Sequence, residues 1–233
     1  MGTSKGYLPP KGFLWKDTKT AITNMAKNNF DSESISKAMN KYVRARRNTS
    51  GDSSRQQYNK QMATSGAKAL NFVNLYNTFG LNDTLNKLDL SNLIGKSNED
   101  IYVGLVDYFA PNSDTFENSI VRDCMAEIFD DFNIFDEENA ESKISDKEFL
   151  QGFFIKYIQK SFISNFFEKI QGLCKNIEET NRAINEVKKY IRVTLETEFT
   201  LEELIKIDWT SSQGERFVSS KCDEAFDIFK ILR

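Results

Sequence analysis

The chain has 233 residues, of which 39% are hydrophobic and 12% aromatic, and its net charge is −3. This composition excludes wholesale disorder, and the length allows one large or two small domains with a buried core. Because the chain has no histidine, Ser-His-Asp and Cys-His catalytic arrangements are excluded and the commonest metal ligand is missing. With only three prolines and eleven glycines, long stretches run without a helix breaker, and we expect an all-α fold.

The charge is distributed unevenly along the chain. Residues 1–80 hold 13 Lys and Arg against 4 Asp and Glu, whereas residues 81–233 hold 18 against 30. Such polarity suits an assembly component with two differently charged faces. Solvated helix faces that happen to be sorted by sign fit the same pattern equally well.

The three cysteines, Cys124, Cys174 and Cys222, are isolated from one another in sequence. Their odd number and the absence of a CxxC pair argue against a disulfide framework or a zinc site. No secretory segment or membrane-length apolar run is visible, so we expect a cytoplasmic protein without a membrane partner. Gly6 stands where a myristoylation motif requires Ser or Thr. No glycine-rich phosphate loop is present, and we expect neither a cofactor nor a metal.

Residues 1–16 are predicted to form an extended N-terminal tail. The segment contains two of the three prolines, Pro9 and Pro10, and has no apolar periodicity. It ends in the apolar run Phe13, Leu14 and Trp15, which we interpret as an anchor on the body. Residues 17–233 are predicted to form one bundle-like helical domain, with a further boundary near 133–145 as an option.

Within this domain, apolar residues recur at helical spacing in eight segments. Gly80 is expected to end the third, and small residues between Ala63 and Ala69 would let another helix approach closely. The expected helices are about 17–28, 33–47, 54–79, 101–109, 115–132, 146–174, 177–195 and 215–232. The expected N-terminal caps include Asp17, Asp31 or Ser32, Ser97 with Asp100, Asp114 and Ser145.

The acidic segment 130–141 has the length of an EF-hand loop. However, Phe132 and Ile134 occupy ligand positions, and Asp136 stands where the sharp turn requires glycine. We therefore interpret the segment as a solvated loop. Carboxylates at helical spacing, such as Glu178 with Arg182, are typical of ion pairs rather than acid–base dyads.

A basic cluster follows the second predicted helix. It consists of Lys37, Lys41, Arg44, Arg46, Arg47 and Arg55. Such a cluster could bind phosphates or an acidic protein surface. Because no aromatic residues are interleaved for base recognition, a nucleic-acid-binding adaptor is the alternative hypothesis, below a protein interface or a plain basic face.

The tail is the segment with the clearest possible chemistry. Removal of Met1 would leave Gly2 with a free α-amine, whose ordinary pKa of about 7.7–8.0 leaves a nucleophilic fraction near neutrality. Glycine can enter a narrow cleft, and Thr3 and Ser4 add small hydrogen-bonding groups. The two prolines stiffen the stem, so that Gly2 could stand roughly 30–40 Å from the anchor. An ordinary disordered terminus is the alternative interpretation.

Several short motifs, taken in order, resemble the QatB family of Qat anti-phage defence systems. The resemblance covers about residues 1–130. The motifs are Met1-Gly-Thr-Ser4 with its Gly/Pro-containing tail, Tyr42-Val-Arg44, Ser50-Gly51, Met62 to Gly66, Leu88-Asp-Leu-Ser91 with Leu93 and Gly95, Asp107, Pro111 and Arg122.

The resemblance implies an operon with a P-loop ATPase, a QueC-like enzyme and a TatD-like nuclease. QueC-like enzymes activate a carboxy-deazaguanine with ATP, and in such defence systems the expected acceptor is a protein N-terminal amine. Carried onto this sequence, the acceptor is Gly2, with Thr3, Ser4, Pro9 and Pro10 in the recognition tail. The expectation is a non-enzymatic subunit whose helical body docks the ATPase. A cryptic enzyme is the least favoured alternative.

Overall fold

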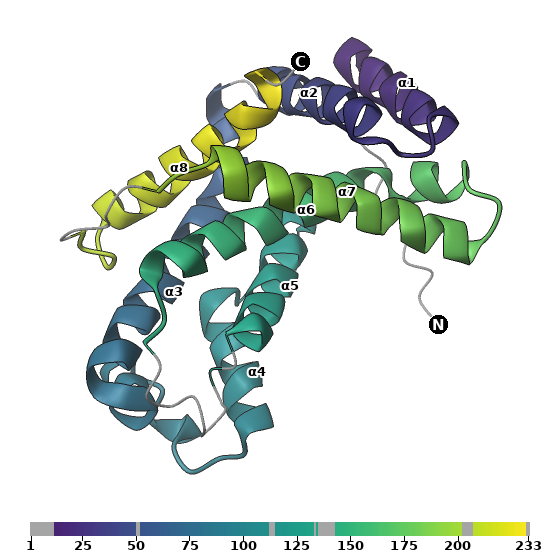
Figure 1. Cartoon of the computed structure of the whole chain (residues 1–233). Coiled ribbons are helices and arrows are strands. Elements are labelled where there is room, and N and C mark those ends of the chain that lie inside the picture. The colour runs from purple at the N-terminus through teal and green to yellow at the C-terminus, as the bar shows by residue number, and fades with distance from the viewer. Residues whose placement is uncertain are drawn as a thin grey trace. The chain divides into compact units, whose positions relative to one another are not determined.

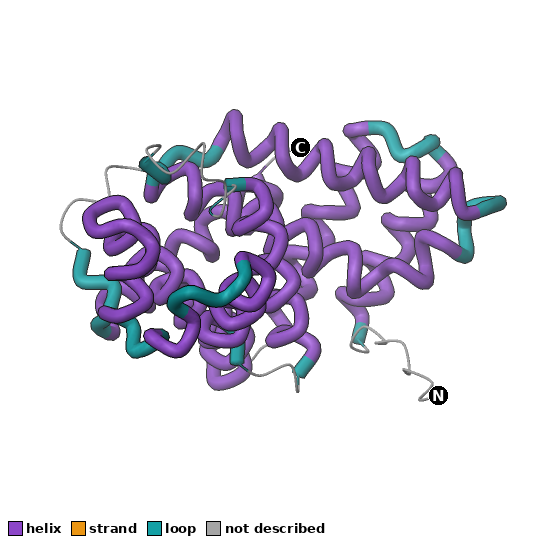
Figure 2. The backbone as a smooth tube through the Cα atoms, turned by 90° about the horizontal axis from the view of Figure 1, so that it is seen from below, coloured by secondary structure: helices purple, strands orange, loops and turns teal. Residues whose placement is uncertain are grey.

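The computed structural model describes residues 12–49, 52–111, 115–132, 134, 143–201 and 207–231, and for 49 and 52–59 the backbone alone. Throughout these residues the regular structure is helical, which confirms the all-α prediction (Figures 1 and 2). The elements are α1 (Phe13–Lys27), α2 (Ser32–Thr49), α3 (Asp52–Lys87), the 3₁₀ turn η1 (Ser91–Leu93), α4 (Asn98–Phe109), α5 (Phe116–Asp131), α6 (Asp146–Gln171), α7 (Ile177–Glu198) and α8 (Ser212–Ile231).

Helix α1 starts four residues earlier than expected, at Phe13 rather than Asp17. Residues 13–16, assigned to the extended tail, therefore form its first turn. The sequence offers no side-chain cap there, and Gly12 precedes the helix without one, at φ 149°. The first turn is stabilised by the burial of Trp15, which is only 5% exposed, and not by a side-chain cap.

Several predicted caps are confirmed by hydrogen bonds. The Asp31 carboxylate accepts from the Ser34 N–H at 2.8 Å, and Ser97 Oγ accepts from the Asp100 N–H at 3.1 Å. The predicted cap Asp114 lies outside the described residues. Helix α5 is instead capped by Thr115, whose Oγ1 accepts from the Asn118 N–H at 3.1 Å.

Gly80 interrupts α3 as predicted, with φ 76° and ψ 177°. The break is confined to this residue. After it the chain resumes helical geometry and the helix continues to Lys87. A positive φ of this size strains any residue with a Cβ, so glycine is required at the break.

The chain divides into two compact units. Unit 1 comprises residues 1–56, 158–200 and 222–233, and unit 2 comprises 57–157 and 201–221. Helices α3, α6 and α8 each contribute to both units. The prediction of one helical domain over 17–233 stays a prediction.

Unit 1 is built around an aromatic cluster from four helices. Tyr42 of α2 is central, with its ring 6.0 Å from Trp15 of α1, 5.3 Å from Phe162 and 5.8 Å from Phe166 of α6, and 6.5 Å from Phe226 of α8. All five rings are buried. The first, middle and last parts of the chain thus share one core.

Unit 2 has its own aromatic cluster. Phe109 of α4 lies 5.6 Å from Phe72 of α3 and 5.2 Å from Phe129 of α5, measured between ring centroids, and Phe129 lies 6.3 Å from Phe149 of α6. These helices follow one another in sequence.

Close helix approach at the small residues of α3 is also confirmed within unit 2. A Cβ added at Gly66 would lie 2.9 Å from Val218 and 3.1 Å from Phe153. The neighbouring Ser65 hydroxyl donates to the Phe109 carbonyl at 2.6 Å.

Candidate functional site

Helices α1 and α2 form an antiparallel hairpin that includes the predicted anchor and the first five residues of the basic cluster (Figure 1). The turn between them contains Asn29 and Phe30, both with positive φ, at 51° and 57°. The turn is held by N–H bonds from Asn29 to the Ala26 carbonyl and from Phe30 to the Met25 carbonyl. Phe30 is itself buried, which keeps this strained turn in place.

The three predicted anchor residues differ in their environment. Trp15 is buried against Tyr42 and Phe166, Leu14 is half-buried, and Phe13 is 76% exposed. The contact with the body is therefore made chiefly by Trp15, which fixes the start of α1. Phe13 stands in solvent at the point where the described chain begins.

A polar groove of about 650 Å³ lies along the α1–α2 hairpin. On α1 its lining residues recur every three or four positions, so they share one face of the helix. The lining residues are Asp17, Thr20, Ala21, Asn24 and Asn28 from α1 and its end, and Asp31, Glu33, Ser34, Lys37 and Lys41 from the turn and α2. Sequence reasoning did not identify this groove, because the two polar stripes are separated by a turn whose geometry the sequence pattern does not show.

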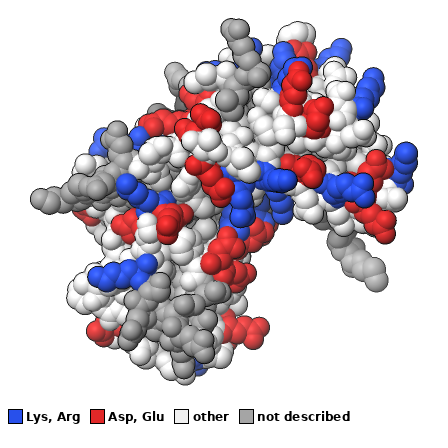
Figure 3. Space-filling view, viewed as in Figure 1, with Lys and Arg blue, Asp and Glu red and all other residues white. Residues whose placement is uncertain are grey.

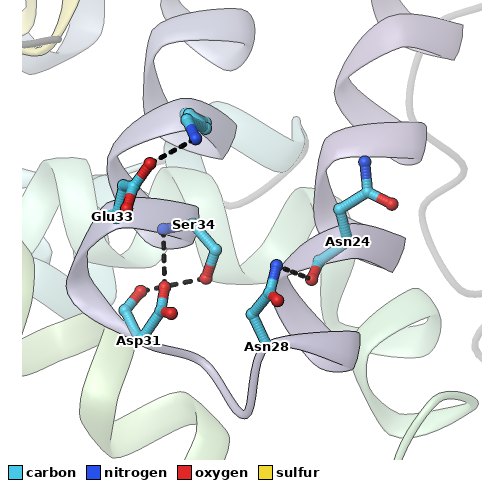
Figure 4. A network of polar contacts seen from close by, with 6 residues as sticks. Asn24, Asn28, Asp31, Glu33 and Ser34 are labelled. Atoms are coloured by element: carbon cyan, nitrogen blue, oxygen red, sulfur yellow. Dashed lines mark hydrogen bonds and ion pairs between the residues drawn. The ribbon is translucent and has the colours of Figure 1, made fainter.

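The end of the groove at the turn carries a network of short polar contacts (Figure 4). Asn28 donates from Nδ2 to the Asn24 carbonyl at 3.0 Å, and the Ser34 hydroxyl donates to the Asp31 carbonyl at 3.0 Å. Hydrogen bonds from Ser34 lower the pKa of the Asp31 carboxyl. Asp31 therefore carries a full negative charge at neutral pH.

The basic cluster does not form one uniform cationic surface. Lys37 contacts Glu33 at 2.5 Å, and the bond to Glu33 raises the Lys37 pKa. Lys41 lies 3.9 Å from Asp17 of α1. Together with the exposed Arg44, these two residues form one row on α2, at spacings of four and three.

Arg46 and Arg47 instead face α8. The Arg46 guanidinium lies 4.1 Å from the centre of the Phe226 ring, a cation–π geometry. Arg47 forms an ion pair with Asp227 and donates to the Asp223 carbonyl at 3.3 Å. These contacts are about 180 residues apart in sequence, and no sequence signal pointed to them. The side chain of Arg55 lies outside the described residues.

The predicted acceptor Gly2 and the recognition residues Thr3, Ser4, Pro9 and Pro10 also lie outside the described residues. The structure describes the chain from Gly12 onward, directly before α1. Gly12 precedes α1 in a bend, at a φ that L-residues rarely adopt. Glycine therefore suits position 12, directly before α1, because a residue with a Cβ would be strained there.

Lys156 and Cys222 are buried titratable side chains elsewhere in the described chain. Lys156 of α6 is buried and contacts Glu127 at 3.4 Å and Asp131 at 2.8 Å on α5. Burial raises the pKa of Cys222 to about 12, so its thiol is inert near neutrality. The described residues contain no group of three or more side chains suited to a metal ion.

The surface mixes both signs of charge: on the face that Figure 3 shows, Lys and Arg side chains lie beside Asp and Glu. Within the described ranges, every helix is too short or too polar to cross a bilayer.

The chain matches a known protein family. The model described as "Qat anti-phage system associated protein QatB" matches residues 51–229. The matched region begins after α2 and extends well beyond the part of the sequence whose motifs carried the resemblance. No curated protein and no solved structure matches the chain.

Proposed function

The chain belongs to the QatB family of the Qat anti-phage system, and from this premise we propose that it is a non-catalytic subunit whose N-terminal glycine is modified. The modifying partner is a QueC-like enzyme, and the modification is an amide-linked deazaguanine on the nitrogen of Gly2. Family membership is the observation that supports a role in the Qat anti-phage system. The matched residues begin at 51, so the role of Gly2 rests on the resemblance of the tail.

The chemistry requires little of this chain beyond an accessible amine. The neutral α-amine of Gly2 attacks the activated carboxyl carbon of the deazaguanine, the leaving group departs, and the ammonium formed loses a proton. Glycine suits this step because it has no Cβ to obstruct a narrow cleft. The chain contributes the nucleophile, and the partner contributes activation.

The hairpin supports this role by holding the base of the tail. Trp15 is buried between α2 and α6, so the first turn of α1 is fixed to unit 1. From Gly12, ten residues of extended chain place Gly2 up to about 31–35 Å away. A partner could therefore take up the N-terminus without disturbing the core around Tyr42.

The helical body is proposed to dock the P-loop ATPase of the same system, with the TatD-like nuclease as a further candidate partner. The mixed charge on its surface favours a protein partner, because both signs are available for complementary contacts.

The modification is tested by intact mass spectrometry after co-expression with the QueC-like enzyme. We expect a mass increase equal to the conjugated deazaguanine, mapped to the N-terminal peptide. Gly2→Pro should abolish it, because proline presents a hindered secondary amine. Gly6→Ala, a change in the same tail away from the amine, is the matched control and should leave the modification intact. An unchanged wild-type mass contradicts the proposal.

A nucleic-acid-binding adaptor is the second candidate, favoured by the row Lys37, Lys41 and Arg44, in which Lys37 and Arg44 are exposed and Lys41 is partly exposed. The structure refines its test. Changing Arg47 to an acidic residue would break its ion pair with Asp227. A loss of DNA binding could then come from destabilised folding instead of from the lost positive charge. The triple change of the row to Glu should abolish a salt-sensitive DNA shift if the row binds phosphates. If the wild type gives no shift, this candidate is excluded.

A further inference from the structure

We draw no further inference here: the strongest candidate, the polar groove along the α1–α2 hairpin, carries none, because no contact among the described residues shows what occupies it.

Discussion

The two units both bury a cluster of aromatic rings, but they assemble it from different parts of the sequence. In unit 2, Phe72, Phe109, Phe129 and Phe149 come from helices that follow one another from α3 to α6. In unit 1, Tyr42 joins rings from α1, α6 and α8, so the core closes only when both ends of the chain are present. Contacts of large sequence separation carry a larger loop-closure cost, and we expect unit 1 to form later in folding.

The units differ also in how they accommodate a buried or half-buried cation. Unit 2 surrounds Lys156 with two carboxylates from the preceding helix. Unit 1 places Arg46 on an aromatic ring and Arg47 on an aspartate, both on the last helix. The second arrangement ties the basic end of α2 to the C-terminal helix, so charges that resemble a ligand-binding patch in sequence are partly structural.

The largest expected effect is the difference in thiol reactivity between the two buried cysteines and the partly exposed one. Cys222 of unit 1 and Cys124 of unit 2 are both fully buried, whereas Cys174 is half-exposed. Because burial raises the Cys222 pKa to about 12, almost none of its thiol is ionised in the native state near neutral pH. Ellman's reagent should label Cys174 promptly and the other two only through opening of their units. Prompt labelling of Cys222 would contradict its place in a closed core.

The same experiment compares the stability of the two units. If unit 1 closes last, Cys222 should become reactive at lower urea than Cys124. Single-cysteine variants, with Cys174→Ser as the common background, separate the two rates.

Truncation of the central rings should have the next largest effect. Phe109→Ala in unit 2 and Phe166→Ala in unit 1 should each lower the free energy of unfolding by about 3–5 kcal/mol. The chain has two tryptophans, Trp15 in unit 1 and Trp209 in unit 2, so fluorescence of single-tryptophan variants reports on each unit. Phe167→Ala, a change at a ring that is 39% exposed, is the control and should cost much less.

Removal of the paired cations should have an intermediate effect. Lys156→Ala is expected to cost about 2–3 kcal/mol, since a buried stem is lost with the ion pairs. Arg47→Ala should cost about 1–2 kcal/mol, because Asp227 is partly exposed and Lys230 lies 3.9 Å from it. Lys156→Met should restore most of the loss in unit 2, as measured by urea denaturation followed through Trp209.

Loss of helix caps should have the smallest effect. Asn176→Ala removes the acceptor for the Glu179 N–H in unit 1, and Thr115→Ala removes the acceptor for Asn118 in unit 2. Each should cost about 1 kcal/mol. Asn176→Asp should be neutral, and a loss as large as that of the alanine variant would mean that the side chain acts otherwise than as a cap.

Local features of the fold are predictable from the sequence, whereas features that depend on distant contacts are not. The sequence predicts the caps Asp31 and Ser97 correctly because each acts on an N–H three positions away, within the reach of a short motif. The predicted start of α1 is four residues too late, because Trp15 stabilises the first turn through Tyr42 and Phe166, and no local pattern shows these contacts. The candidate site divides in the same way. The row Lys37, Lys41 and Arg44 was recognised as basic, but the partners Asp223, Phe226 and Asp227 were not.

The sequence by itself determined the helical class, most helix limits, the glycine break in α3 and the family resemblance. These follow from interactions within one turn of a helix or from short ordered motifs. Only the tertiary structure decided that Tyr42 gathers rings from four helices, that two arginines of the basic cluster face α8, and that α1 and α2 leave a polar groove between them. Such contacts join residues up to about 190 positions apart, as in the bond from Asn40 to the Lys230 carbonyl. The packing of the helices against one another determines these contacts, and the periodicity of a single segment does not.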